Sequence, residues 1–168
     1  MCCEDETLAF ERENNMKLRI NSTIKEIEDI VRNTNILDIG CSGMAQGKSM
    51  MNRLIELSER YIGIDKKENA EEFELNKKFE VITCFEVLEH LDNVGLCLNR
   101  VKEHLMEDGV FICSVPNIFH MYYKFRKESE THISSFTKVI LKQRLDKYFL
   151  DVKIKNINFG RTLLAICK

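Results

Sequence analysis

Two carboxylates and one imidazole lie within five residues of one another in the segment FEVITCFEVLEHLD, residues 79–92. The first half of this segment is mostly apolar, with β-branched side chains in its middle, and predicts a buried strand. If a helix begins near Glu86, the i, i+3, i+4 spacing places Glu86, Glu89 and His90 on one face of that helix. Such a cluster can hold a divalent cation, take up a proton or orient a substrate. The sequence therefore predicts a reactive site where this strand ends.

The elements that must position this cluster alternate between strands and helices. Apolar periodicity predicts strands over residues 35–40, 61–65, 79–85, 110–117, about 151–159 and 162–167, and helices over residues 20–31, 48–60, 93–106 and 136–149. The spacing of Thr23 and Glu26 predicts a capping box in the first helix. This alternation indicates an α/β fold with a doubly wound, mostly parallel sheet.

In parallel sheets of this kind, ligands bind beyond the carboxyl ends of the strands. Several polar residues and one glycine fall at those ends and are candidates for a shared site: Asp38, Gly40, Asp65, Glu86 and Asn117. The edge of the sheet to which the strands point is therefore the expected location of the chemistry.

Length and composition are those of one globular domain. The chain has 168 residues, 44% of them hydrophobic and 31% charged, with a net charge of −2. We expect a single domain over residues 1–168, with the helical segment 1–32 packed on it. No apolar run approaches the roughly 18 residues of a membrane span. Seven cysteines without a CxxC pair indicate a reducing, cytoplasmic setting.

The segment ILDIGCSGMAQGKS, residues 36–49, has more than one interpretation. Its end, Gly47-Lys48-Ser49, matches the last part of a P-loop, although Ser42 stands where the first glycine is required. A small P-loop kinase or NTPase is therefore one alternative. The GxGxxG pattern of dinucleotide-binding proteins is absent.

A third interpretation fits this segment better, because it resembles motif I of the class I S-adenosylmethionine-dependent methyltransferases. Asp38 and Gly40 match the motif, Ser42 replaces its second glycine, and Gly43 follows. Asp65 ends the next predicted strand, where a carboxylate can accept hydrogen bonds from both ribose hydroxyls. The resemblance implies S-adenosylmethionine as cofactor and a Rossmann-like fold with an antiparallel C-terminal strand.

The chain departs from that family between Asp65 and Phe79. Only 13 residues lie between them, too few for the helix and strand that the family usually has there. We therefore expect a trimmed sheet edge. The stretch NAEEFEL resembles the adenine-binding loop of the family, which implies that the Asn69 side chain accepts from the adenine amino group and the Ala70 amide donates to the ring.

Three further stretches, EVLEHL, SVPN and THISSFT, resemble one branch of these enzymes. The branch includes O-methyltransferases of quinone biosynthesis and 2′-O-methyltransferases of small-RNA 3′ ends. The resemblance implies a Mg²⁺ or Mn²⁺ site made by Glu86, Glu89, His90 and His132, with Glu86 and His90 also serving catalysis. Such an ion can coordinate two vicinal oxygens of the acceptor and lower the pKa of its hydroxyl. The expected acceptor is the hydroxyl of a small molecule or of an RNA.

Other interpretations of these residues stay open. Glutamates near a helix start are favourable with the helix dipole whatever else they do, and His90 could serve only as a hydrogen-bonding group. The [DNS]PP[YFW] signature of amino-methylating DNA enzymes is absent, which makes DNA an unlikely substrate. The shortened sheet edge also permits a non-catalytic, methyltransferase-like binding module.

Overall fold

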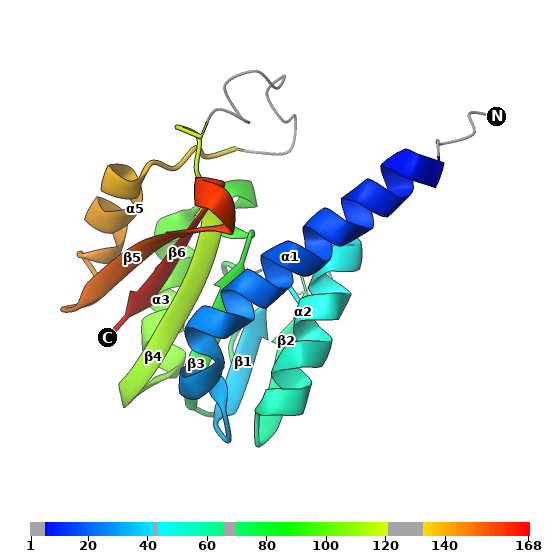
Figure 1. Cartoon of the computed structure of the whole chain (residues 1–168). Coiled ribbons are helices and arrows are strands. Elements are labelled where there is room, and N and C mark those ends of the chain that lie inside the picture. Colours follow the sequence, from blue (N-terminus) through cyan, green and yellow to red (C-terminus); the bar gives the residue numbers. More distant parts are fainter. Residues whose placement is uncertain (1–5, 42–43, 66–69, 121–132) are drawn as a thin grey trace.

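The computed structural model describes the backbone of residues 6–41, 44–65, 70–120 and 133–168, and the side chains of these residues except in 6–13 and 44–48. Within these ranges, one six-stranded sheet forms the centre of the molecule (Figure 1). Its strand order is β2-β1-β3-β4-β6-β5. The strands are β1 (Asn35–Ile39), β2 (Arg60–Ile64), β3 (Phe79–Phe85), β4 (Leu105–Pro116), β5 (Val152–Ile157) and β6 (Thr162–Cys167).

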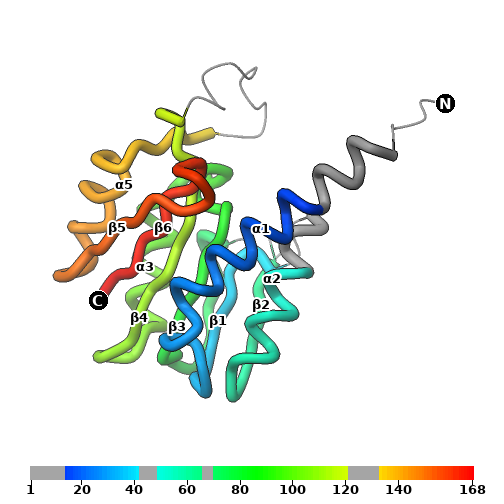
Figure 2. The backbone as a smooth tube through the Cα atoms, viewed as in Figure 1, coloured from blue at the N-terminus to red at the C-terminus, as the bar shows by residue number. Residues whose placement is uncertain are grey.

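The sheet is mostly parallel. Strands β2, β1, β3 and β4 run in the same direction, and β6 runs antiparallel to both of its neighbours, β4 and β5. The predicted fold class, including the antiparallel C-terminal strand, is therefore confirmed. Because the four parallel strands point the same way, their carboxyl ends meet at one edge, the upper edge in Figure 2.

Helices cover both faces of the sheet (Figure 1). Helices α1 (Glu6–Val31) and α2 (Met44–Leu57) lie on one face, and α3 (Val94–His104) and α5 (Lys138–Leu145) lie on the other. Strand β4 serves both faces by alternation, because Val110 and Ile112 belong to the apolar cluster under α1 and α2, whereas Phe111 and Cys113 belong to the opposite cluster. Strands covered on both faces explain why the sequence of β4 is almost continuously apolar.

The bounds of all four helices differ from the predicted ones, and two of the differences have an identifiable cause in the caps. Helix α1 begins at Glu6, so Thr23 lies inside the helix and its hydroxyl donates to the carbonyl of Arg19 instead of capping a helix start. The predicted capping box is therefore wrong. The last helix is shorter than expected: Thr137 caps it by accepting from the amide of Ile140, and it ends at Leu145.

The segment between β2 and β3 confirms the trimmed sheet edge, since its described residues, 70–78, contain only turns. His104 at the end of α3 holds this segment in place. Its Nε2 accepts from the Leu75 amide at 2.9 Å, its Nδ1 lies 2.8 Å from the Arg100 carbonyl, and its ring packs 4.9 Å from that of Phe73. A buried histidine thus replaces the backbone pairing that an edge strand would provide.

We predict that His104→Phe lowers the free energy of unfolding by about 1–3 kcal/mol, because the Leu75 amide loses its acceptor while the ring contact with Phe73 is kept. Urea denaturation measures this change. His104→Gln is the matched control, since its amide oxygen can accept from Leu75. Equal stability of His104→Phe and the wild type would contradict the anchoring role.

Helix α1 contributes fully buried side chains to the core, among them Ile27, which is 0% exposed. We predict that Ile27→Ala costs about 2–5 kcal/mol of unfolding free energy, because it removes buried methyl groups and leaves a cavity against the sheet. Lys25→Ala, on the exposed side of the same helix, serves as the control and is expected to stay within about 0.5 kcal/mol of the wild type. Equal effects of the two variants would mean that α1 is not part of the core.

Candidate functional site

The turn after β1 contains Gly40 in a left-handed conformation, with φ of +85°. Its amide donates to the Ile64 carbonyl at 2.6 Å, which ties the turn to the end of β2. A Cβ added at this position would lie 2.3 Å from the Val87 side chain, so only glycine fits both the conformation and the space. The turn therefore passes close under the segment that follows β3.

Asp38 is a buried carboxylate at the end of β1, with 4% of its surface exposed. Its Oδ1 accepts from the Thr83 hydroxyl at 2.7 Å and its Oδ2 accepts from the Tyr61 hydroxyl at 2.8 Å. Burial raises the pKa of Asp38 to about 6, although both hydrogen bonds act in the opposite direction. Asp38 thus joins β2, β1 and β3 at the edge where ligands are expected, and its predicted part in cofactor binding stays a prediction.

Asp65 and Ala70 are the other described residues of the predicted cofactor site. Asp65 directly follows β2 and is half-buried, and Ala70 is buried beside the segment that replaces the edge strand. Ser42, Gly43 and Asn69 lie outside the described residues. Asp38, Gly40 and Asp65 therefore lie at one edge of the sheet, while the contacts of the predicted set with a cofactor stay predictions.

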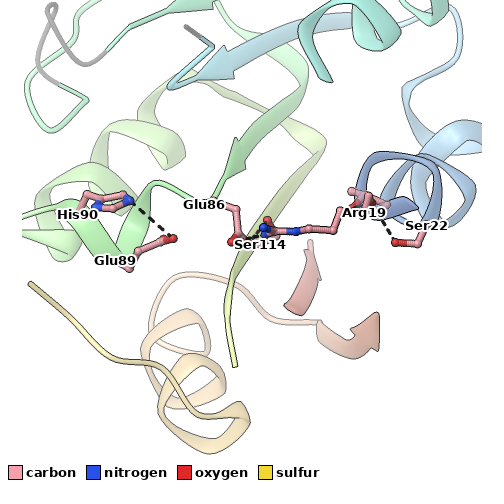
Figure 3. Close-up of polar contacts among 7 residues, drawn as sticks. Arg19, Ser22, Glu86, Glu89, His90 and Ser114 are labelled. Atoms are coloured by element: carbon pink, nitrogen blue, oxygen red, sulfur yellow. Dashed lines mark hydrogen bonds and ion pairs between the residues drawn. The ribbon is translucent and has the colours of Figure 1, made fainter. Parts of the chain in front are cut away.

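The chain after β3 differs from the predicted helix. Glu86 has a left-handed backbone, with φ of +55°, and only a single 3-10 turn, η2 (Leu88–His90), follows. The prediction of one helical face for Glu86, Glu89 and His90 is therefore wrong, because a left-handed residue breaks the helical spacing. Figure 3 shows the Glu86 side chain directed toward Arg19, away from Glu89 and His90.

Glu89 and His90 form a pair of their own. Glu89 is 2% exposed, and its Oε1 lies 3.9 Å from Nε2 of the partly exposed His90. The carbonyl of Glu89 also accepts from the amides of Ile133 and Ser134, at 2.9 and 3.0 Å. The start of the segment that leads into α5 is thus fixed against η2.

The arrangement of the described residues does not favour the predicted four-ligand metal site. The Glu86 carboxylate is held by Arg19 and Ser114, and no three His, Cys, Asp or Glu side chains within the described ranges are placed to hold a metal ion. The fourth predicted ligand, His132, lies outside those ranges. The metal site therefore stays a prediction that requires Glu86 to leave its present partners.

Three residues of this site were missed by reading the sequence: Arg19, Tyr61 and Ser114. Arg19 lies 67 positions from its partner Glu86, so no local pattern connects the two residues. Ser114 belongs to the SVPN stretch, and its position beside Glu86 follows from the pairing of β3 with β4. Asn117, expected at the site, instead donates to the Gly160 carbonyl at 2.9 Å and links the end of β4 to the turn before β6.

The P-loop alternative is not supported by the backbone. Residues 47–49 lie inside α2, which begins at Met44, whereas a P-loop places its last glycine in the loop before the helix.

Comparisons with known proteins identify the family to which the chain belongs. The profile of a family described as a methyltransferase domain matches residues 11–152, and the chain belongs to this family. The fold and this match place it among the class I S-adenosylmethionine-dependent methyltransferases.

Among curated proteins, the ubiquinone biosynthesis O-methyltransferase of Rickettsia canadensis (strain McKiel) is 28% identical over 58% of this chain and 58% of the relative. The protein of the same name from Rickettsia conorii (strain ATCC VR-613 / Malish 7) is 27% identical over 60% of this chain and 41% of the relative. The chain thus spans about half the length of the curated relatives that it matches.

Solved structures share the fold. The plantazolicin methyltransferase BpumL, in complex with SAH, has a TM-score of 0.68 at 15% identity, covering 97% of this chain and 88% of that one. DesVI of Streptomyces venezuelae has a TM-score of 0.66 at 12% identity, covering 99% of both chains. At these identities the likeness establishes the architecture.

The raised pKa of Asp38 predicts a pH-dependent stability. The folded chain keeps the proton up to about pH 6, whereas the ordinary pKa of an aspartate is 3.8, so ionisation of Asp38 lowers the free energy of unfolding as pH rises from about 4 to 6. Asp38→Asn removes this loss. Between pH 4 and pH 7 we expect the variant to gain about 1–3 kcal/mol relative to the wild type.

Denaturant unfolding at several pH values measures this difference. Asp108→Asn, which alters an exposed carboxylate, is the control and should show no comparable gain. A constant difference between Asp38→Asn and the wild type over this pH range would contradict the buried, protonated state.

Proposed function

We propose that this chain transfers a methyl group from S-adenosylmethionine to a hydroxyl oxygen of a small molecule. The observation that carries the proposal is the turn at Gly40, whose backbone packs closely against the Val87 side chain. This turn lies at the carboxyl edge of a parallel sheet, next to Asp38 at the end of β1 and Asp65 after β2. The family match supports methyl transfer, and the names of the curated relatives support oxygen as the accepting atom.

The described residues fit the proposed cofactor. A carboxylate such as that of Asp65 accepts two hydrogen bonds from vicinal ribose hydroxyls, and it lies one strand away from the glycine turn. Gly40 has no side chain, so the cofactor can approach the protein backbone at this turn. Two residues earlier, the Asp38 carboxylate is fixed by its hydrogen bonds with Tyr61 and Thr83. Ala70 follows Asn69 on the side where the adenine is expected.

S-adenosylmethionine would supply a methyl group on a positively charged sulfur, which becomes neutral as the carbon–sulfur bond breaks and the methyl–oxygen bond forms. The acceptor hydroxyl loses its proton in this reaction, and His90 is our candidate base, because an imidazole nitrogen can take up that proton. The Glu89 carboxylate, 3.9 Å from His90 Nε2, would stabilise the positive charge that the ring then carries. Glu86 would accept a hydrogen bond from the acceptor and orient it.

A small-molecule acceptor is favoured over RNA. The curated relatives reported above are named for ubiquinone biosynthesis, and none of those names refers to RNA. No helix in the described part of the chain is long and apolar enough to cross a membrane. A cytoplasmic location stays a prediction of the sequence.

We predict that Asp65→Ala weakens binding of S-adenosylhomocysteine ten- to a hundred-fold, about 1.5–3 kcal/mol, because the ribose hydroxyls lose their acceptor. Isothermal titration calorimetry measures the affinity. Asp29→Ala, which removes an exposed carboxylate from α1, is the matched control and should bind as the wild type does.

Unchanged affinity of Asp65→Ala would remove the ribose role, and tight binding of ATP without binding of S-adenosylhomocysteine would overturn the proposed function. Cofactor binding without methyl transfer to any hydroxyl compound in a broad panel would favour the non-catalytic module.

A further inference from the structure

The ion pair between Arg19 of α1 and Glu86 connects the N-terminal helix to the carboxyl end of the central strand β3. Arg19 Nη2 lies 2.6 Å from Glu86 Oε2, and the two side chains are only 27% and 24% exposed. The other carboxylate oxygen, Oε1, accepts from the Ser114 hydroxyl at 3.0 Å. Both oxygens of Glu86 are therefore engaged by fixed donors from two different elements (Figure 3).

The backbone holds Glu86 in this orientation. Its amide donates to the Ser114 carbonyl at 2.9 Å, and its φ of +55° is a conformation that costs a non-glycine residue free energy. Such a conformation persists only where the surrounding contacts enforce it. Here the contacts with Arg19 and Ser114 enforce it, and they direct the carboxylate to the α1 side of the sheet edge.

This orientation separates Glu86 from the other predicted metal ligands. Figure 3 shows Glu89 and His90 on one side of the strand end, and Glu86 with Arg19 on the other. A cation that contacted all three side chains would require the Glu86 carboxylate to turn away from a guanidinium that is always charged and that binds carboxylates through a planar set of donors. The Arg19 guanidinium therefore already provides the positive charge beside the Glu86 carboxylate.

We propose that Arg19 takes the place of a divalent metal at this site: its guanidinium is the fixed cation that positions the Glu86 carboxylate for the acceptor, and methyl transfer needs no metal ion. The inference rests on the proposed function and deepens it. Arg19 is a positioning residue that acts through Glu86, whose carboxylate oxygens keep further lone pairs for an acceptor hydroxyl. Helix α1 then forms the wall of the acceptor site next to β3 and β4.

Two measurements that require no catalysis test the ion pair and the absence of a metal. In calorimetric titrations with Mn²⁺, the wild type should show no binding up to millimolar concentrations. In urea unfolding, Arg19→Gln and Glu86→Gln should each lower the midpoint of the transition. The double variant should be no less stable than the less stable of the two single variants, because the same interaction is lost in all three. Stoichiometric Mn²⁺ binding that Glu86→Gln abolishes, or strictly additive midpoint shifts, would overturn the proposal.

A kinetic measurement tests the positioning role, with catechol as the methyl acceptor. EDTA should leave the rate unchanged, and Arg19→Gln should raise the KM for catechol at least ten-fold while the affinity for S-adenosylhomocysteine stays within two-fold. Arg19→Lys should recover part of the loss, and Lys25→Gln, which removes a charge from the exposed side of α1, should match the wild type. Loss of activity with EDTA and its return with Mn²⁺, or equal KM values for Arg19→Gln and Lys25→Gln, would overturn the inference.

The two proposals fail separately. If the wild type does not bind S-adenosylhomocysteine, the proposed function fails, whereas the Mn²⁺ titration and the unfolding cycle still decide whether Arg19 is the cation of Glu86. If S-adenosylhomocysteine binds and catechol is not methylated, the same two measurements decide the inference on their own.

Discussion

The buried carboxylate of Asp38 is the constraint on which the rest of the site depends. It lies at the end of β1, and by accepting from Tyr61 and Thr83 it joins the strands on either side, β2 and β3, at one edge of the sheet. Burial disfavours its ionised form, and the two hydroxyl donors only partly offset that cost. These two hydrogen bonds fix Asp38 two residues before the Gly40 turn, where the sequence predicts cofactor binding.

A second constraint acts at the end of β3, where the chain divides its polar side chains between the two faces of the sheet. The left-handed backbone of Glu86 sends its carboxylate toward α1, and the 3-10 turn that follows places Glu89 and His90 toward the segment leading into α5. The two groups are therefore placed apart: Glu86 lies beside the Arg19 guanidinium, and Glu89 pairs with His90 in η2.

At the shortened sheet edge, side-chain contacts take the place of the backbone pairing that a further strand would provide. Within the described residues, no strand pairs with the outer side of β2, and the buried ring of His104 accepts from the Leu75 amide in the segment before β3. Ala70 and Phe73 fill the apolar space at that edge. A buried histidine and a few apolar side chains thus hold the segment between β2 and β3 at this edge of the sheet.

The order of strands and helices, the sheet class and the placement of Asp38, Gly40 and Asp65 at strand ends followed from the sequence alone, because alternation, glycine placement and strand ends depend on local patterns. The trimmed edge followed from the departure of the sequence from the family that it resembles. The partners of those residues did not. Arg19 and Glu86 are 67 residues apart, and the left-handed conformation of Glu86 contradicts the helical spacing of its own segment. Only packing of α1 across the sheet edge brings the two charges together, since contacts between distant segments depend on the assembled core and not on local sequence.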